Sequence, residues 1–157
     1  MKLYIKQKVF SWGDKFVVKD EYGNDRYFVQ GEVFSWGKKL HVYNINDAEI
    51  AYIEQKLISF MPRYKIFIHG SPAVEMVQKF AFFQRKYFVE ELGWSVYGDF
   101  WAHEYEISRN GMQVALICKE WFTWGDSYVL DVNDPNDELA ALAVILSVDC
   151  MTAQESN

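Results

Sequence analysis

The side chains that most often carry chemistry, which are histidine, cysteine and paired carboxylates, are scattered along this sequence. His41, His69 and His103 each fall in a separate predicted strand, and none has the short spacing of a zinc motif such as His-Glu-x-x-His. We therefore expect partly exposed strand histidines and no metal centre. Neither a Gly-x-Ser-x-Gly nucleophile elbow nor a glycine-rich phosphate loop occurs in the chain.

The thiols and carboxylates give equally weak signals. Cys118 and Cys150 lie in the apolar stretches VALICKEW and ILSVDCM, so we interpret them as small core residues and not as a disulfide. Carboxylates could pair as acid and base in a cleft, and the candidates are Glu104, Glu106, Glu90 and Glu91.

The acidic stretch DEYGND, residues 20–25, superficially resembles a calcium loop. It lacks the spacing and terminal glutamate of an EF-hand, and a hairpin turn explains it better. The sequence thus predicts no catalytic residue, no cofactor and no metal site, and we expect a protein that is not an enzyme.

Composition indicates which elements must position these groups. The chain has 157 residues, 50% of them hydrophobic and 18% aromatic, which favours one folded, strand-rich domain over residues 1–157. A formal net charge of -6 argues against nucleic acid as a partner. The N-terminus lacks the apolar run of a signal peptide, and the apolar stretch at 139–148 is too short to span a bilayer. We expect a cytoplasmic protein that does not span a membrane.

Alternating apolar and polar residues, interrupted by turn signals at intervals of about ten residues, predict about a dozen antiparallel strands between about residues 2 and 133. The unit Phe-Ser/Thr-Trp-Gly occurs at 10–13, 34–37 and 122–125. We interpret it as a hairpin corner, in which the hydroxyl bonds local backbone, the glycine reverses the chain and the tryptophan covers the turn. The alternative is a functional aromatic rim that dips into a membrane interface.

The pattern changes to a helix over about residues 135–151. Asp134 or Asn133 is a suitable N-cap, Pro135 suits the first helical position, and Asp137 and Glu138 lie where the helix dipole favours acids. The following residues, Leu139 to Val148, are apolar on nearly every side, so the helix must be buried on every side. We predict a mainly β fold, an antiparallel barrel of roughly twelve strands closed around a buried hydrophobic C-terminal helix.

Several stretches resemble the LURP-one-related family in order along nearly the whole chain. They are FSWGDKFVVKDEYGNDRYFVQGEVFSWGKKLHVYN, AYIEQKLISFMPRYKIF, GDFWAHEYEI, ICKEWFTWGDSYVLDV and LAALAVILSVD. The resemblance implies the tubby C-terminal fold, a barrel of roughly twelve strands around a hydrophobic helix. That fold class also includes the phospholipid scramblases and the tubby proteins, which bind phosphoinositides.

In scramblases, an acidic segment before the terminal helix is proposed to hold calcium. On this chain the segment falls on Trp124-Gly125 and the following DSYVLDVN. Asp131 and Glu120 match two of its acids, whereas Asn133 and Phe122 replace two others. Hard cations need several convergent oxygen ligands, so we expect no metal near Asp131.

A small basic patch, Arg85 and Lys86 beside Tyr87 and Phe88, could touch an anionic headgroup. Together with the resemblance, it suggests a non-enzymatic binding or scaffold module. Its partner would be an anionic phospholipid at the membrane periphery or another protein. The alternatives are a scramblase-like, lipid-mobilising protein and an enzyme with a carboxylate and histidine site in a surface cleft.

Overall fold

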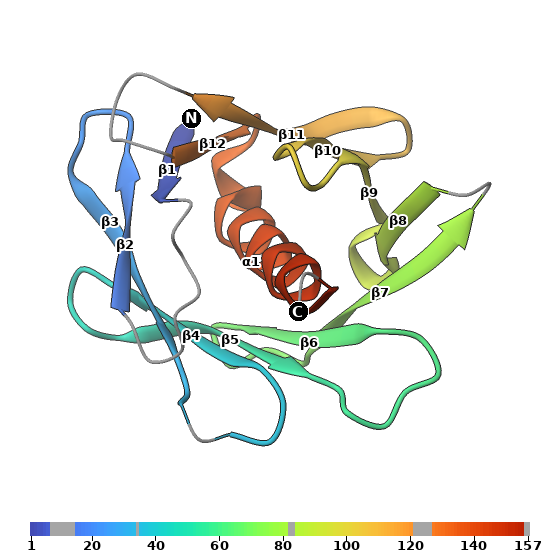
Figure 1. The fold of residues 1–157 in the computed structure, drawn as a ribbon. Coiled ribbons are helices and arrows are strands. Elements are labelled where there is room, and N and C mark those ends of the chain that lie inside the picture. Colours follow the sequence, from blue (N-terminus) through green and yellow to red (C-terminus); the bar gives the residue numbers. More distant parts are fainter. Residues whose placement is uncertain (7–14, 34, 82–83, 121–126, 156–157) are drawn as a thin grey trace.

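The computed structural model describes residues 1–6, 15–33, 35–81, 84–120 and 127–155 of the chain. Within these residues, twelve antiparallel strands form a closed barrel, and a single long helix lies inside it (Figure 1). Each strand pairs with the next in sequence, and β12 closes the ring by pairing with β1. The predicted fold class is therefore confirmed.

The elements follow the alternating runs of the sequence closely. The strands are β1 (Lys2–Lys6), β2 (Lys15–Asp20), β3 (Asp25–Gly31), β4 (Lys39–Asn44), β5 (Glu49–Gln55), β6 (Arg63–Ile68), β7 (Val74–Ala81), β8 (Gln84–Val89), β9 (Trp94–Asp99), β10 (Glu104–Arg109), β11 (Met112–Glu120) and β12 (Ser127–Val132). Alternate residues point inward, as on β5, where Ala51 and Ile53 are buried and the side chains between and beside them are not.

The helix begins with one 3₁₀ turn, η2 (Pro135–Asp137), before α1 (Glu138–Glu155). Asp134 is the predicted cap, since its side chain accepts a hydrogen bond from the backbone N–H of Asn136. Regular α-helix therefore starts at 138 instead of 135, and it continues to 155 instead of 151. Residues 141–148 are fully buried, as an all-apolar helix requires. No helix among the described residues is both long and apolar enough to cross a membrane.

A carboxylate at each end of the helix bonds to an inward-facing tyrosine. Tyr27 donates its hydroxyl to Glu138 in the first turn of α1. Tyr128 does the same to Asp149 near the other end. Buried carboxylates are stable only when hydrogen-bonded or paired, so these two contacts fix how deeply the helix sits in the barrel.

The turns agree with the sequence in most respects. Asn110 and Gly111 have φ of 52° and 77°, as a tight hairpin requires. In the second aromatic unit Ser35 donates its hydroxyl to the carbonyl of Gly37 at 2.7 Å, and Gly37 has φ 79°. The tryptophan does not cover this corner, because Trp36 is 90% exposed. The units at 10–13 and 122–125, and Phe34, lie outside the described residues.

Two predictions of strand structure were wrong. His69 and His103 lie in turns with positive φ, 48° and 54°, because each comes where the chain reverses beside a strand end. The alternating run KYFVEEL, residues 86–92, predicts a strand along its whole length. Residues 90–92 instead form the 3₁₀ turn η1 (Glu90–Leu92), which Gly93 closes in the left-handed conformation.

Candidate functional site

In a barrel whose strands follow one another in order, every second connection lies at the same end. Three connections lie at the end where α1 terminates: β3–β4 (described at 32–33 and 35–38), β5–β6 (56–62) and β9–β10 (100–103). The side-chain amides of Gln55, at the end of β5, and Gln154, in the last turn of α1, bond each other there at 3.0 Å. The residues of these connections are therefore gathered around the C-terminal end of the helix.

Large apolar side chains point into solvent from this end. Ile58 is 93% exposed, Phe60 101% and Trp36 90%. We call the whole set the apolar rim: Val33, Trp36, Leu57, Ile58, Phe60, Phe80 and Trp101. Phe80 belongs to the apolar rim because β7 continues past its last pairing with β6, which joins Val77 to Arg63, and so projects beyond β6 at this end.

The two most apolar loops of the rim support each other. Leu57 packs so closely on Gly37 that a Cβ added to this glycine would lie 2.8 Å from the leucine Cδ2. Ser59 donates its hydroxyl to the carbonyl of Met61 at 2.7 Å, which closes the turn between Ile58 and the next strand. The exposed side chains are thus presented by ordered loops.

Basic groups accompany these apolar side chains. The guanidinium of Arg85 lies 5.9 Å from the ring centroid of Trp101, within cation–π distance. Lys38 and Lys56 lie in the β3–β4 and β5–β6 connections, where the only acid is Glu32. This end of the barrel therefore combines exposed apolar groups with cations.

The opposite end has a different character. Its six connections are 21–24, 45–48, 69–73, 90–93, 110–111 and 133–137, and they contain six acids with no lysine or arginine. We call these acids the acidic rim: Glu21, Asp47, Glu90, Glu91, Asp134 and Asp137. Much of the net charge of -6 is thus concentrated at the end where the helix begins.

The three histidines do not converge. On the outer face of β4, His41 lies between two carboxylates, with Nε2 2.8 Å from Glu32 and Nδ1 2.6 Å from Glu49, and its hydrogen bond lowers the pKa of Glu32. His69 follows β6 at the end of the acidic rim, whereas His103 lies at the other end, 3.5 Å from Asp149. This arrangement offers no shared metal or catalytic site.

The thiols are poorly suited to nucleophilic chemistry. Cys150 is fully buried, and burial raises the pKa of its thiol to about 12. Burial also raises the pKa of Cys118, although this residue is only partly buried because it faces outward on β11. The core prediction thus fits Cys150 and was wrong for Cys118. Both thiols are free.

The four glutamates named as possible acids and bases do not all line one surface hollow. Glu104 and Glu106 both line a shallow groove of about 360 Å³ across β9, β10 and β11, and Tyr97 donates its hydroxyl to Glu106. Glu90 instead pairs with a lysine, and Glu91 accepts a hydrogen bond from the backbone N–H of Glu75 at 3.2 Å. The groove lies outside the barrel and has no histidine among its lining residues.

Asp131 and Glu120, the two acids that align with the calcium segment proposed for scramblases, each form an ion pair with a nearby amine. Asp131 lies 3.4 Å from the N-terminal amine, and Glu120 lies 3.5 Å from Nζ of Lys2. Asn133 donates to the carbonyl of Gln113 at 2.7 Å, and Phe122 lies outside the described residues. Within the part of the chain that the structure describes, no three metal-ligating side chains gather to hold an ion.

The DEYGND stretch forms the predicted hairpin turn. One carboxylate oxygen of Asp20 accepts hydrogen bonds from the backbone N–H groups of Tyr22 and Asn24, at 2.9 and 2.8 Å. The other oxygen accepts from the side-chain amide of Asn24 at 3.1 Å. The acid therefore stabilises the turn, as aspartate commonly does.

Comparisons with known proteins place this architecture in a family. The model of the family described as LURP-one-related matches residues 1–149. The uncharacterized protein YxjI of Bacillus subtilis (strain 168) is 34% identical over 149 residues, covering 95% of this chain and 92% of its own. The X-ray structure of the Arabidopsis thaliana protein AT5G01750 shares the fold, with a TM-score of 0.64 at 16% identity, over 94% of this chain and 90% of that one. The chain belongs to the LURP-one-related family.

Proposed function

We propose that this protein is a non-catalytic binding module whose apolar rim docks on an anionic phospholipid surface. The observation that carries the proposal is the nearly complete exposure of Trp36, Ile58 and Phe60 at one end of the barrel. Isolated exposed apolar residues are common, but several large ones gathered at one place mark an interaction surface.

The chemistry of the rim suits the boundary between headgroups and acyl chains. Tryptophan is favoured at this boundary because its ring is amphipathic, and aliphatic side chains gain from leaving water. Burying a side chain such as Ile58 or Phe60 contributes roughly 1.5–3 kcal/mol each. Because the loops are ordered by the contacts of Gly37 and Ser59, little of this gain is lost to loop ordering.

Charge gives the docking an orientation. Lysine and arginine near an anionic bilayer contribute about 1 kcal/mol each, and Lys38, Lys56 and Arg85 lie on or beside the rim. The acidic rim is at the far end of the barrel, where an anionic surface repels it least. The enclosed position of α1 does not favour a scramblase-like role in which this helix would enter the bilayer.

Co-sedimentation with vesicles tests the proposal. We expect retention on vesicles of phosphatidylcholine with about a third phosphatidylserine, weaker retention in high salt, and little on phosphatidylcholine alone. Replacing both Ile58 and Phe60 with serine should weaken retention by at least tenfold. The matched control is Ile45→Ser, which changes an equally apolar residue, 65% exposed, at the other end.

Either of two vesicle results would overturn the proposal. One is no retention of the folded protein on anionic vesicles at low salt. The other is equal retention of the rim variant and the Ile45→Ser control, which would mean that the protein adsorbs to vesicles nonspecifically and not through the rim. Capture of a protein by the rim without any vesicle binding would also overturn it and would identify the rim as a protein interface.

A further inference from the structure

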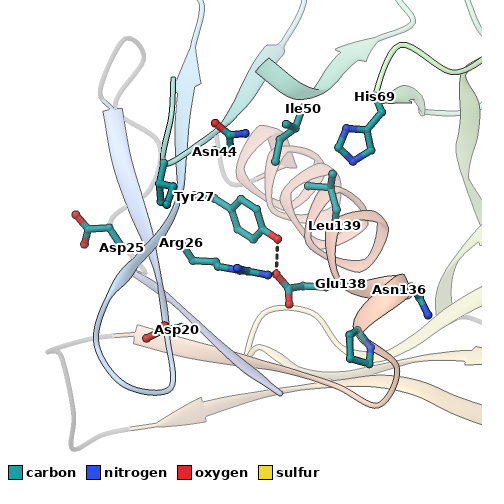
Figure 2. A pocket seen from close by; sticks show the side chains of 12 residues that line it. Asp20, Asp25, Arg26, Tyr27, Asn44, Ile50, His69, Asn136, Glu138 and Leu139 are labelled. Carbon is teal, nitrogen blue, oxygen red and sulfur yellow. Dashed lines mark hydrogen bonds and ion pairs between the residues drawn. The ribbon is translucent and has the colours of Figure 1, made fainter. Parts of the chain in front are cut away.

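A pocket of about 530 Å³ opens at the acidic end of the barrel, beside the first turn of α1 (Figure 2). It forms where the β2–β3 and β4–β5 hairpins meet the beginning of the helix. Its polar lining residues include Arg26, Asn44 and Glu138, and its apolar lining residues include Ile45, Ile50 and Leu139. This pocket is at the opposite end of the barrel from the apolar rim.

Glu138 is the unusual member of this lining. Only 2% of the residue is exposed, yet it carries a carboxylate. Its Oε1 accepts a hydrogen bond from Nε of Arg26 at 3.0 Å and another from the hydroxyl of Tyr27. Its Oε2 has no hydrogen-bond partner among the described residues. Figure 2 shows one oxygen directed at Tyr27 and Arg26 and the other pointing away from both.

The unpartnered Oε2 of Glu138 favours a ligand that can donate a hydrogen bond to it. Buried carboxylate oxygens are normally paired, because a desolvated acceptor without a donor costs free energy. Tyr27 cannot serve both oxygens, since its single hydroxyl is already used, and burial raises the pKa of its phenol well above the ordinary value. A bound donor reaching this oxygen from the pocket would complete the hydrogen bonding of the carboxylate.

The surrounding charge selects a cation. Three acids line the pocket, Asp20, Asp25 and Glu138. Asp25 pairs with Lys19 at 2.6 Å and Glu138 with Arg26 at 3.0 Å, so these five side chains together leave one negative charge in excess. The arginine is already bonded to Glu138, which raises its pKa. The connections of the nearby acidic rim contain six acids and no lysine or arginine, although Glu90 and Asp137 pair with Lys79 and Arg109 on the adjacent strands. An anion such as a phosphate or carboxylate would meet net negative charge here, whereas a cation would be attracted.

We propose that this pocket binds a primary alkylammonium group, with its N–H groups donating to Oε2 of Glu138 and its carbon chain lying against Ile50 and Leu139. A quaternary ammonium fits poorly, because it has no N–H to donate and the pocket lacks the aromatic cage that such cations prefer. The ligand class is thus a small amine with an apolar body.

Titration with three probes of equal chain length tests this inference. Hexylammonium should cause saturable shifts in ¹H–¹⁵N NMR spectra at Tyr27 and Leu139. Hexyltrimethylammonium should bind at least tenfold more weakly, and hexanoate should cause no saturable shift. These probes distinguish the charge and the donor requirement from simple apolar binding.

Two variants and a control separate binding from structure. Glu138→Gln should weaken hexylammonium binding at least tenfold, and Ile45→Trp should block the pocket while leaving the bonds between Glu138, Tyr27 and Arg26 in place. Glu91→Gln removes a rim charge outside the pocket lining and should leave binding within twofold. If Glu138→Gln does not fold, Ile45→Trp alone still decides the question.

The inference fails if hexylammonium gives no saturable shift, if hexanoate binds equally well, or if folded Ile45→Trp binds as the parent does. In each case the contacts of Glu138 would serve only to anchor the helix. Vesicle retention of Glu138→Gln and Ile45→Trp should equal that of the parent, because the proposed membrane surface is at the other end of the barrel.

Discussion

Replacing Leu142 with aspartate tests whether the barrel encloses the helix. Leu142 is completely buried in the middle of α1. Loss of the leucine side chain costs about 2–5 kcal/mol. Keeping the new carboxyl neutral at pH 7, when its ordinary pKa is about 3.9, costs about 4 kcal/mol more. The total, roughly 6–9 kcal/mol, compares with a stability of about 5–15 kcal/mol for a typical domain.

We therefore expect Leu142→Asp to be unfolded or barely folded at pH 7. Leu142→Asn provides the uncharged match. Because burial raises the folded-state pKa of the aspartate above its unfolded value, its stability relative to Leu142→Asn should increase by about 1.4 kcal/mol for each pH unit between 7 and 4. Urea unfolding followed by tryptophan fluorescence at pH 7 and pH 5 measures this difference.

Leu116→Asp is the control, since Leu116 is 39% exposed on the outer face of β11 and should change stability by less than about 1 kcal/mol. A melting temperature of Leu142→Asp within about 2 °C of the parent would refute the enclosure of the helix. A constant difference from Leu142→Asn across the pH range would refute the argument that the site is dry.

Three further predictions follow from particular contacts. Gly98→Ala should destabilise the protein by roughly 3 kcal/mol or more in urea unfolding, because φ is 139° and a Cβ would lie 2.5 Å from the Cα of Tyr105. Gly111→Ala, with φ 77° and open space around the Cβ, should cost only about 1 kcal/mol. Cys150 should resist iodoacetamide at pH 8 until denaturant is added, and rapid labelling of the native protein, read by mass spectrometry, would contradict its burial. Burial raises the pKa of Tyr105 and Tyr128 far above 10, so the stability that they contribute is present below about pH 10 and falls as pH rises further. Absorbance at 295 nm should show both phenols ionising only with alkaline unfolding.

Local sequence patterns predicted most of the fold, because the formation of strands and turns depends largely on residues close together in the sequence. The runs KFVVKD and SYVLDV coincide with β2 and β12, since alternation and flanking turn residues define both ends of each. The pattern failed at residues 90–92, where Gly93 permits a left-handed closure that alternation does not reveal. It also ended the helix at 151, whereas α1 continues to 155. The helix can continue because no glycine or proline interrupts residues 151–155.

The site was less predictable because its contacts join distant segments. Glu138 was expected only to favour the helix dipole, whereas its hydrogen-bond partner Tyr27 is 111 residues away. No local pattern indicates that pairing. The Trp36 ring was predicted to cover its own turn, with an aromatic rim as the alternative. Sequence alone cannot distinguish these two, because the turn at Gly37 packs against Leu57 of a different loop, and no local pattern reveals that contact.

The topology allows the two ends of this barrel to differ in chemistry without disturbing its core. Most buried strand residues belong to one hydrophobic core with the helix, which restricts their chemistry, whereas the connections are free of that constraint. In this barrel each strand pairs with the next, so successive connections alternate between the two ends. When the connections at one end differ in amino-acid composition from those at the other, the two ends become distinct surfaces. Apolar side chains such as Ile58 gather at one end, and acids such as Asp134 gather at the other. A membrane-facing end and a cation-binding end, as proposed, could therefore change independently of each other and of the helix between them.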